Sequence, residues 1–138
     1  MKTKTSMALL AFIAVITGAC GSGSAPAVKE FETHRVNDLV VSLLNEKGEL
    51  AQGQNSFIVA FHSAATNKAV DAGRVLVEPS MAMPGMAPMT APVELTPTGE
   101  TGRYAAKGDF AMSGSWRFAV RWDGPAGQGS TTFNSNVR

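Results

Sequence analysis

Hydrophobic and polar residues alternate along much of the chain after residue 36, which is the pattern of strands with one buried face. Residues 115–124 show it most clearly, because four large apolar side chains fall on one face: Trp116, Phe118, Val120 and Trp122. Residues 56–62 alternate in the same way. Shorter apolar or β-branched runs predict five further strands, at 37–45, 73–79, 91–97, 102–110 and 130–136.

Turn-forming residues separate these segments, at 46–49, 65–73, 96–102 and 123–129. No apolar period of 3.6 residues is sustained anywhere after the first twenty residues. About seven strands in about 100 residues predict an all-β fold, an immunoglobulin-like antiparallel β-sandwich. A small closed barrel is the alternative.

The first twenty residues have the composition of an export signal. Lys2 and Lys4 precede an apolar run of about ten residues, which is too short to span a membrane as a helix. The sequence ITGAC at 16–20 resembles a bacterial lipoprotein processing site, in which cleavage leaves a lipid-modified Cys20 as the new N-terminus. We therefore predict a signal peptide at 1–19, a flexible tether at 20–33 and a folded domain at 34–138. An ordinary cleaved signal that contains a cysteine is the alternative.

Charge limits the classes of partner. The formal net charge is +1, and removing residues 1–19 takes away two lysines and no acid, which leaves −1. Such a domain has no electrostatic attraction for nucleic acid or for anionic lipid. We therefore expect no nucleic-acid partner, contact with the membrane only through the lipid anchor, and a location in the cell envelope that faces the periplasm or the outer surface.

The segment EPSMAMPGMAPMTAP, residues 78–92, places four methionines in nine positions: Met81, Met83, Met86 and Met89. Thioether sulfur is a soft, uncharged donor that suits Cu(I) and Ag(I) and needs no deprotonation. The spacing allows one loop to fold two or three sulfurs around an ion, with Pro84 and Gly85 fixing a tight turn. We therefore predict a metal site formed by these methionines.

Three residues elsewhere are candidate neighbours of this site. Met112 is a fifth sulfur donor from a different segment. Trp116 either caps a bound ion through its ring or belongs to the core, and His62 lies on the polar phase of its strand, where it is either solvated or reaches a neighbouring loop. Two alternative roles for the methionines stay open, namely a surface that contacts a partner protein and adaptable core filler.

Three short motifs in order resemble the YtkA-like domain, a relative of the FixH family. They are Met83-Pro84-Gly85-Met86, Gly102-Arg103-Tyr104 and Met112-Ser113-Gly114-Ser115-Trp116, and the segment QGQNSFIVAF at 52–61 is similar to the entry strand of that family. The resemblance covers roughly residues 36–122. It implies an immunoglobulin-like sandwich in the cell envelope, and the FixH branch is associated with a copper-transporting pump.

No set of residues in the sequence forms a nucleophile, a base and an orienting group, so we expect no enzyme activity. Tyr104, in a Gly-x-Tyr motif near a strand start, is expected to be structural, with its hydroxyl hydrogen-bonded to backbone at a corner of the sandwich. We predict an envelope lipoprotein that binds Cu(I) or Ag(I) and delivers it to, or withholds it from, a membrane transporter. The alternative is a non-catalytic module that docks through its methionine loop onto an efflux or envelope-assembly complex.

Overall fold

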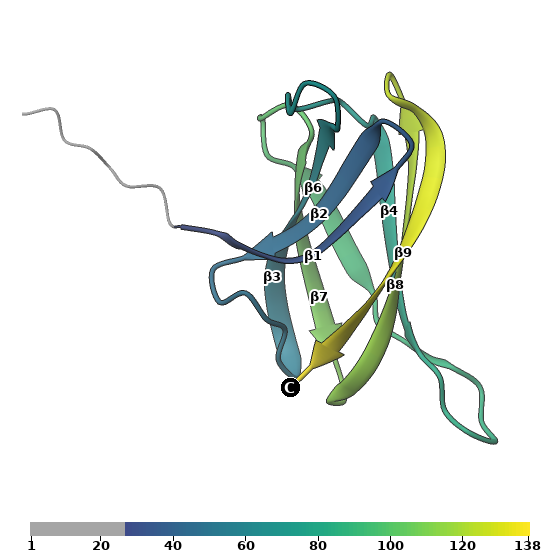
Figure 1. Cartoon of the computed structure of the whole chain (residues 1–138). Helices are drawn as coiled ribbons and strands as arrows, with labels where there is room; N and C mark the ends of the chain where they lie inside the picture. The colour runs from purple at the N-terminus through teal and green to yellow at the C-terminus, as the bar shows by residue number, and fades with distance from the viewer. Residues whose placement is uncertain (1–26) are drawn as a thin grey trace, which may run out of the picture.

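The computed structural model describes residues 27–138, which form two antiparallel sheets packed face to face (Figure 1). The five-stranded sheet has the order β1-β2-β3-β7-β6, and the four-stranded sheet has the order β5-β4-β8-β9. The strands are β1 (Lys29–Val36), β2 (Leu39–Asn45), β3 (Gly53–Ser63), β4 (Arg74–Met81), β5 (Met89–Thr90), β6 (Val93–Pro97), β7 (Arg103–Phe110), β8 (Gly114–Gly124) and β9 (Gly127–Val137). The predicted all-β sandwich is confirmed.

All seven predicted strands are present, and β1 and β5 are additional. β1 begins at Lys29, five residues before the start that the sequence predicted for the folded domain. The predicted signal peptide, Cys20 and the first part of the predicted tether lie outside the described residues. Within residues 27–138, no helix is long and apolar enough to cross a membrane.

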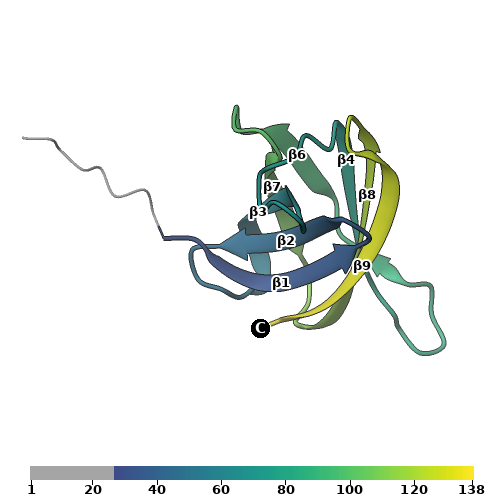
Figure 2. The same cartoon turned by 45° about the horizontal axis from the view of Figure 1, so that its top comes forward.

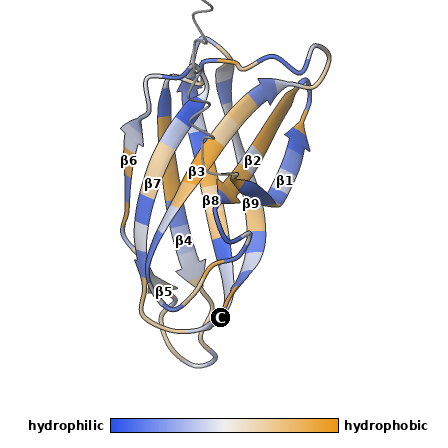
Figure 3. Ribbon diagram, turned by 90° about the vertical axis from the view of Figure 1, so that its left-hand side faces the viewer, coloured by the Kyte–Doolittle hydropathy of each residue, from blue (hydrophilic) through white to orange (hydrophobic). Residues whose placement is uncertain are grey.

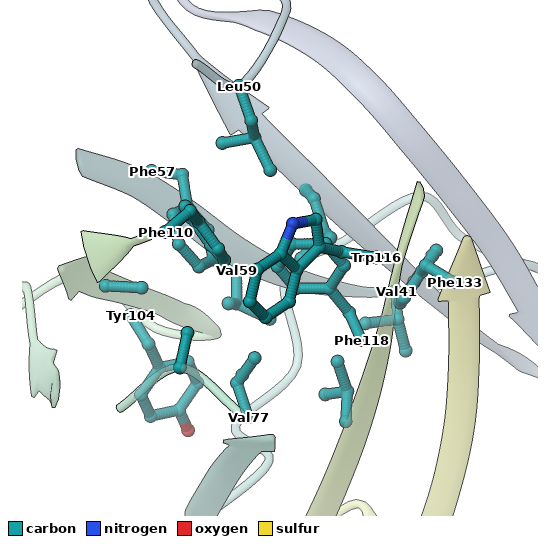
Figure 4. Close-up of a cluster of buried hydrophobic side chains, with 14 of the residues drawn as sticks. Val41, Leu50, Phe57, Val59, Val77, Tyr104, Phe110, Trp116, Phe118 and Phe133 are labelled. Carbon is teal, nitrogen blue, oxygen red and sulfur yellow. The ribbon is translucent and has the colours of Figure 1, made fainter. Parts of the chain in front are cut away.

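The core lies between the sheets and is rich in aromatic rings (Figure 4). The predicted inward faces are correct, because Phe57, Val59 and Phe61 of β3 are buried, as are the alternate residues of β8 from Trp116 to Trp122. Rings pack edge to face across the sandwich, with centroids 5.2 Å apart for Phe110 and Trp116. This geometry is favourable for aromatic pairs and helps to fix how the sheets sit on each other.

One seam between the sheets is joined by β1 and β9, which lie side by side (Figure 2). His34 of β1 makes a 3.0 Å hydrogen bond through Nδ1 with the Thr131 hydroxyl, and its ring lies 4.9 Å from that of Phe133. β1 is mostly hydrophilic, as Figure 3 shows, and only part of its inward face packs on the core. It is an edge strand covered by its neighbour in the other sheet.

The connections gather at two ends of the sandwich. The methionine end comprises the β4–β5 loop (82–88) and the β7–β8 turn (111–113), and Figure 1 shows the β4–β5 loop projecting from it. The far end comprises the loop at 64–73 and the turns at 98–102 and 125–126. The register fixes this division, since Gly114 at the start of β8 pairs with Val137, whereas Gly124 pairs with Gly127 at the other end.

Candidate functional site

The Met-Pro-Gly-Met sequence forms the tight turn that the sequence predicted. The Met86 N–H donates a 3.1 Å hydrogen bond to the Met83 carbonyl oxygen, and Gly85 has a φ of 74°. Proline in the second position and a left-handed residue in the third are the features of a type II turn. The turn therefore holds the backbones of Met83 and Met86 close together at the tip of a hairpin.

The base of this hairpin is a pair of methionines. Met81, the last residue of β4, is the direct antiparallel partner of Met89 in β5. Directly opposed residues on antiparallel strands point to the same face, with Cβ atoms about 5 Å apart. Met81 is buried and Met89 is half-buried against the core, so both side chains point inward at the end of the sandwich.

The remaining two hairpin methionines differ in exposure. Met83, two residues beyond the end of β4, is half-buried, and its neighbour Ala82 is exposed. Met86 is 70% exposed at the tip. We call Met81, Met83, Met86 and Met89 together the methionine hairpin, in which Met81 and Met89 face inward, Met83 is half-buried and Met86 faces solvent.

Gly114 provides the surface on which Met81 rests. A Cβ atom at this position would lie only 2.7 Å from the Met81 methyl carbon and 3.7 Å from its sulfur. The φ of Gly114 is +139°, a conformation that residues with a side chain rarely adopt. Sequence reasoning did not assign Gly114 a role at the site, although it lies inside the Met112–Trp116 motif.

Met112 lies in the neighbouring β7–β8 turn at the same end of the molecule and is 42% exposed. Its carbonyl oxygen accepts a 3.0 Å hydrogen bond from the Trp116 ring Nε1–H. Trp116 itself is 1% exposed and packs on Phe110. Trp116 is therefore a core residue, the second of its two predicted roles, and its polar edge anchors the turn.

His62 does not belong to this site. It pairs with Val40 and bridges to Ala69 at the end of β3, whereas the start of β3, Gly53, pairs with Phe110 near the methionine end. Nine residue steps along an extended strand separate Gly53 from His62, roughly 30 Å. The prediction that His62 neighbours the hairpin is wrong because strand direction carries it to the far end.

The segment that forms the hairpin is itself uncharged. Between Glu78 and Glu94 the sequence has no Asp, Glu, Lys or Arg. Among residues 27–138, no three His, Cys, Asp or Glu side chains gather closely enough to hold a metal ion. The soft donors available at the methionine end are therefore neutral thioethers.

At the far end, the Tyr104 hydroxyl donates a 3.2 Å hydrogen bond to Asp71 Oδ1, which also accepts the Gly73 N–H at 2.8 Å. The hydroxyl therefore has the predicted backbone partners, at Ala72 and Gly73, and in addition a carboxylate partner that the sequence did not predict. Burial, followed by this hydrogen bond and the negative charge of Asp71, raises the pKa of Tyr104, while hydrogen bonds from the backbone of Ala72 and Gly73 act in the opposite direction.

Comparison with known proteins identifies the family. Residues 33–121 match the YtkA-like family. This match covers more than half of the chain and confirms the resemblance drawn from the sequence motifs. No curated protein matches the chain. Among solved structures, a DUF4426 family protein from Pseudomonas aeruginosa PAO1 has a TM-score of 0.53 at 17% identity, covering 77% of this chain and 96% of that one. At this identity the likeness concerns the fold alone.

Proposed function

The chain belongs to the YtkA-like family, and from this premise we propose that it is a lipid-anchored, non-catalytic protein of the cell envelope that binds Cu(I) or Ag(I) through the methionine hairpin. In this role it delivers the ion to a membrane transporter or withholds the ion from it. The single observation that carries the proposal is the direct pairing of Met81 with Met89 beneath the Met83–Met86 turn.

The geometry of that pair supports shared coordination. Two sulfurs bound to one ion, each about 2.3 Å from it, lie roughly 4 Å apart. Opposed Cβ atoms about 5 Å apart allow this approach, since methionine has three rotatable side-chain bonds. Met83, half-buried at the start of the turn, can supply a third sulfur, Met86 can fold over the tip, and Met112 is a fifth candidate from the neighbouring turn.

The chemistry of the donors supports a soft monovalent ion. Thioethers bring no negative charge to offset that of a divalent cation, and the segment from Pro79 to Val93 contributes none. Partial burial of Met81 and Met89 at the edge of the core lowers the local dielectric, which further disfavours a doubly charged ion. Cu(I) and Ag(I) are the ions that fit these donors.

A competition titration with a Cu(I)-binding dye under anaerobic conditions tests the metal proposal. We expect one ion per chain for the wild type, and loss of binding when all four hairpin methionines are replaced by leucine. Leucine preserves apolar volume and removes only the sulfur, so this variant should remain folded. Met112→Leu, measured separately, reports whether the neighbouring turn contributes a ligand. A wild-type protein that binds no ion, or a four-leucine variant that binds as well, would contradict the proposal.

The proposed lipid anchor has its own test. Cells supplied with a labelled fatty acid should incorporate the label into the wild-type protein, and Cys20→Ala should abolish incorporation. Absence of label in the wild type would rule out the anchor while leaving the copper titration unaffected.

A second function is favoured by the exposure of two apolar side chains at one end, Met86 and Met112. In this alternative, the methionine end docks onto an efflux or envelope-assembly complex, and apolar area rather than sulfur provides affinity. Leucine should then replace methionine with little effect, whereas Met86→Glu should abolish capture of the partner. Copper binding and docking therefore differ in their response to the leucine variants.

A further inference from the structure

We infer that Met86 is a site of reversible oxidation by hypohalous acids such as hypochlorous acid, and that the hairpin presents this one sulfur while it shields the other three. The inference does not depend on copper binding. It depends on how the structure divides four chemically identical side chains that lie within nine residues of one another.

The backbone of the hairpin keeps Met86 outward. Pro84 has a fixed φ, Gly85 takes the left-handed conformation that the turn requires, and the Met86 N–H is bound to the Met83 carbonyl. A Cβ added at Gly85 would meet no atom within 4 Å, so the tip stands clear of the sandwich. The Met86 side chain is the most exposed large apolar side chain among the described residues, at 70%.

The other hairpin sulfurs are protected to different degrees. Met81 is buried, and its methyl group lies against the backbone at Gly114. An oxygen added to its sulfur would place a polar group in the apolar core without a partner. Met83 and Met89 are half-buried, and Met89 packs on the core. A sulfoxide at Met86, by contrast, stays in water and does not disturb the packing of the fold.

The reaction balances without a cofactor. The sulfur lone pair attacks the chlorine of hypochlorous acid, which forms a chlorosulfonium ion and releases hydroxide. Water then adds to the sulfur as chloride leaves, and the water loses both of its protons. One of these protons neutralises the hydroxide. The sulfur is oxidised by two electrons to the sulfoxide, the chlorine is reduced to chloride, and one proton is released overall. Methionine sulfoxide reductases reverse the modification.

The change in chemistry at the tip is large although the change in structure is small. A sulfoxide is polar and presents a hard oxygen where the thioether presented a soft sulfur. Oxidation of Met86 therefore removes apolar surface from the tip and, if the proposed function holds, one of the donors available to Cu(I). The exposed Met86 sulfur would then make the proposed metal site sensitive to oxidants.

Sub-stoichiometric hypochlorous acid, followed by peptide mapping with fragment-ion localisation, tests the inference on the metal-free protein. Cleavage after Arg74 and Arg103 places the four hairpin methionines in one peptide, and cleavage after Lys107 and Arg117 places Met112 in another. We expect Met86 to carry the largest share of oxygen and Met112 the next. Met81 should react slowest, on the order of tenfold less than Met86, because its oxidation requires local opening.

The protein unfolded in urea is the matched control, since exposure is then equal and the methionines should react alike. Met86→Leu should not pass its share of oxidation to Met81. If Met83, Met89 or Met112 takes as much oxygen as Met86 in the native protein, or if the native order persists in urea, the assignment is wrong. Because no metal is present, a failure of copper binding would leave this result interpretable.

Discussion

The two ends of the sandwich hold their loops in different ways. At the far end, backbone packs on backbone: a Cβ at Gly102 would lie 2.7 Å from the Phe61 carbonyl oxygen, and one at Gly124 would lie 2.5 Å from the Gly73 Cα. At the tip of the methionine hairpin, a Cβ at Gly85 would meet nothing within 4 Å, and at Gly114, at the base of that end, it would meet a side chain, Met81, rather than backbone. The far end thus depends on glycine for close packing, and the hairpin tip depends on it only for its backbone conformation.

This difference separates what folding requires from what it leaves free. At the far end, hydrogen bonds among carboxylate, hydroxyl and backbone groups restrict which residues the loop positions can hold. Asp71, for example, accepts hydrogen bonds from both the Tyr104 hydroxyl and the Gly73 N–H. The hairpin tip has one hydrogen bond across its turn and a largely exposed side chain. Folding alone gives no reason for methionine at position 86.

The largest expected effect comes from comparing alanine at two of the glycines that have positive φ, Gly102 and Gly85. Gly102→Ala adds strain of about 1–2 kcal/mol and a backbone clash worth about 1–3 more, so we expect a loss of roughly 3 kcal/mol in the free energy of unfolding. Gly85→Ala carries only the strain, roughly 1 kcal/mol. Urea unfolding followed by the fluorescence of the buried Trp116 and Trp122 measures both. Equal losses would mean that the far end relaxes freely and that the contrast is wrong.

The next effect separates two methionines of one hairpin. Met81→Ala removes a buried side chain and leaves a cavity beside Gly114, so we expect a loss of about 2 kcal/mol. Met86→Ala should change the free energy of unfolding by less than about 0.5 kcal/mol. Met81→Leu is the control for shape and should cost less than about 1.5 kcal/mol. A costly Met86→Ala would show that the tip packs against something in solution.

The pattern of the chain was sufficient to predict seven of the nine strands but not β1 and β5, each of which lies at the edge of a sheet. The alternation in 115–124 requires a strand with one buried face whichever strands lie beside it, so β8 could be predicted from the sequence. β1 has a mixed pattern because Glu30 and Glu32 frame a bulge and its cover comes from β9, about 100 residues later. β5 has only two residues, which pair solely at the base of the hairpin, and so gives no periodic signal.

The site was predictable only as far as its chemistry was local. The Pro84-Gly85 turn follows from the dipeptide itself. The pairing of Met81 with Met89, and the contact of Met81 with Gly114, depend on register and on the packing of β4 beside β8. His62 was placed on the correct phase of its strand but at the wrong end, since a period of two residues shows which side faces out and not where along the molecule it lies.

A smaller effect is expected from the polar network of the far end. Tyr104→Phe removes the hydroxyl that donates to Asp71 but keeps the ring on Phe61, so we expect a loss of about 1 kcal/mol. The Gly73 N–H still satisfies the carboxylate, which limits the cost. Urea unfolding again provides the measurement. A loss above about 3 kcal/mol would mean that the hydroxyl holds the loop at 64–73 in place.

The smallest expected effect concerns the ionisation of the same residue. Tyr104 is the only tyrosine of the chain, so the ultraviolet absorbance of tyrosinate reports on it alone. Burial, the hydrogen bond to Asp71 and the charge of Asp71 raise its pKa above the ordinary value of 10.0, so its titration midpoint in the folded protein should exceed that in urea. The folded state then favours the neutral phenol, and this stabilisation is complete below pH 10 and declines as the pH rises through the folded pKa. Asp71→Asn removes the carboxylate charge and should move the midpoint down toward the value in urea without reaching it, because burial, the largest cause, remains. Identical midpoints in the native protein and in urea would show that the hydroxyl is solvated, and would remove the electrostatic part of the contrast between the two ends.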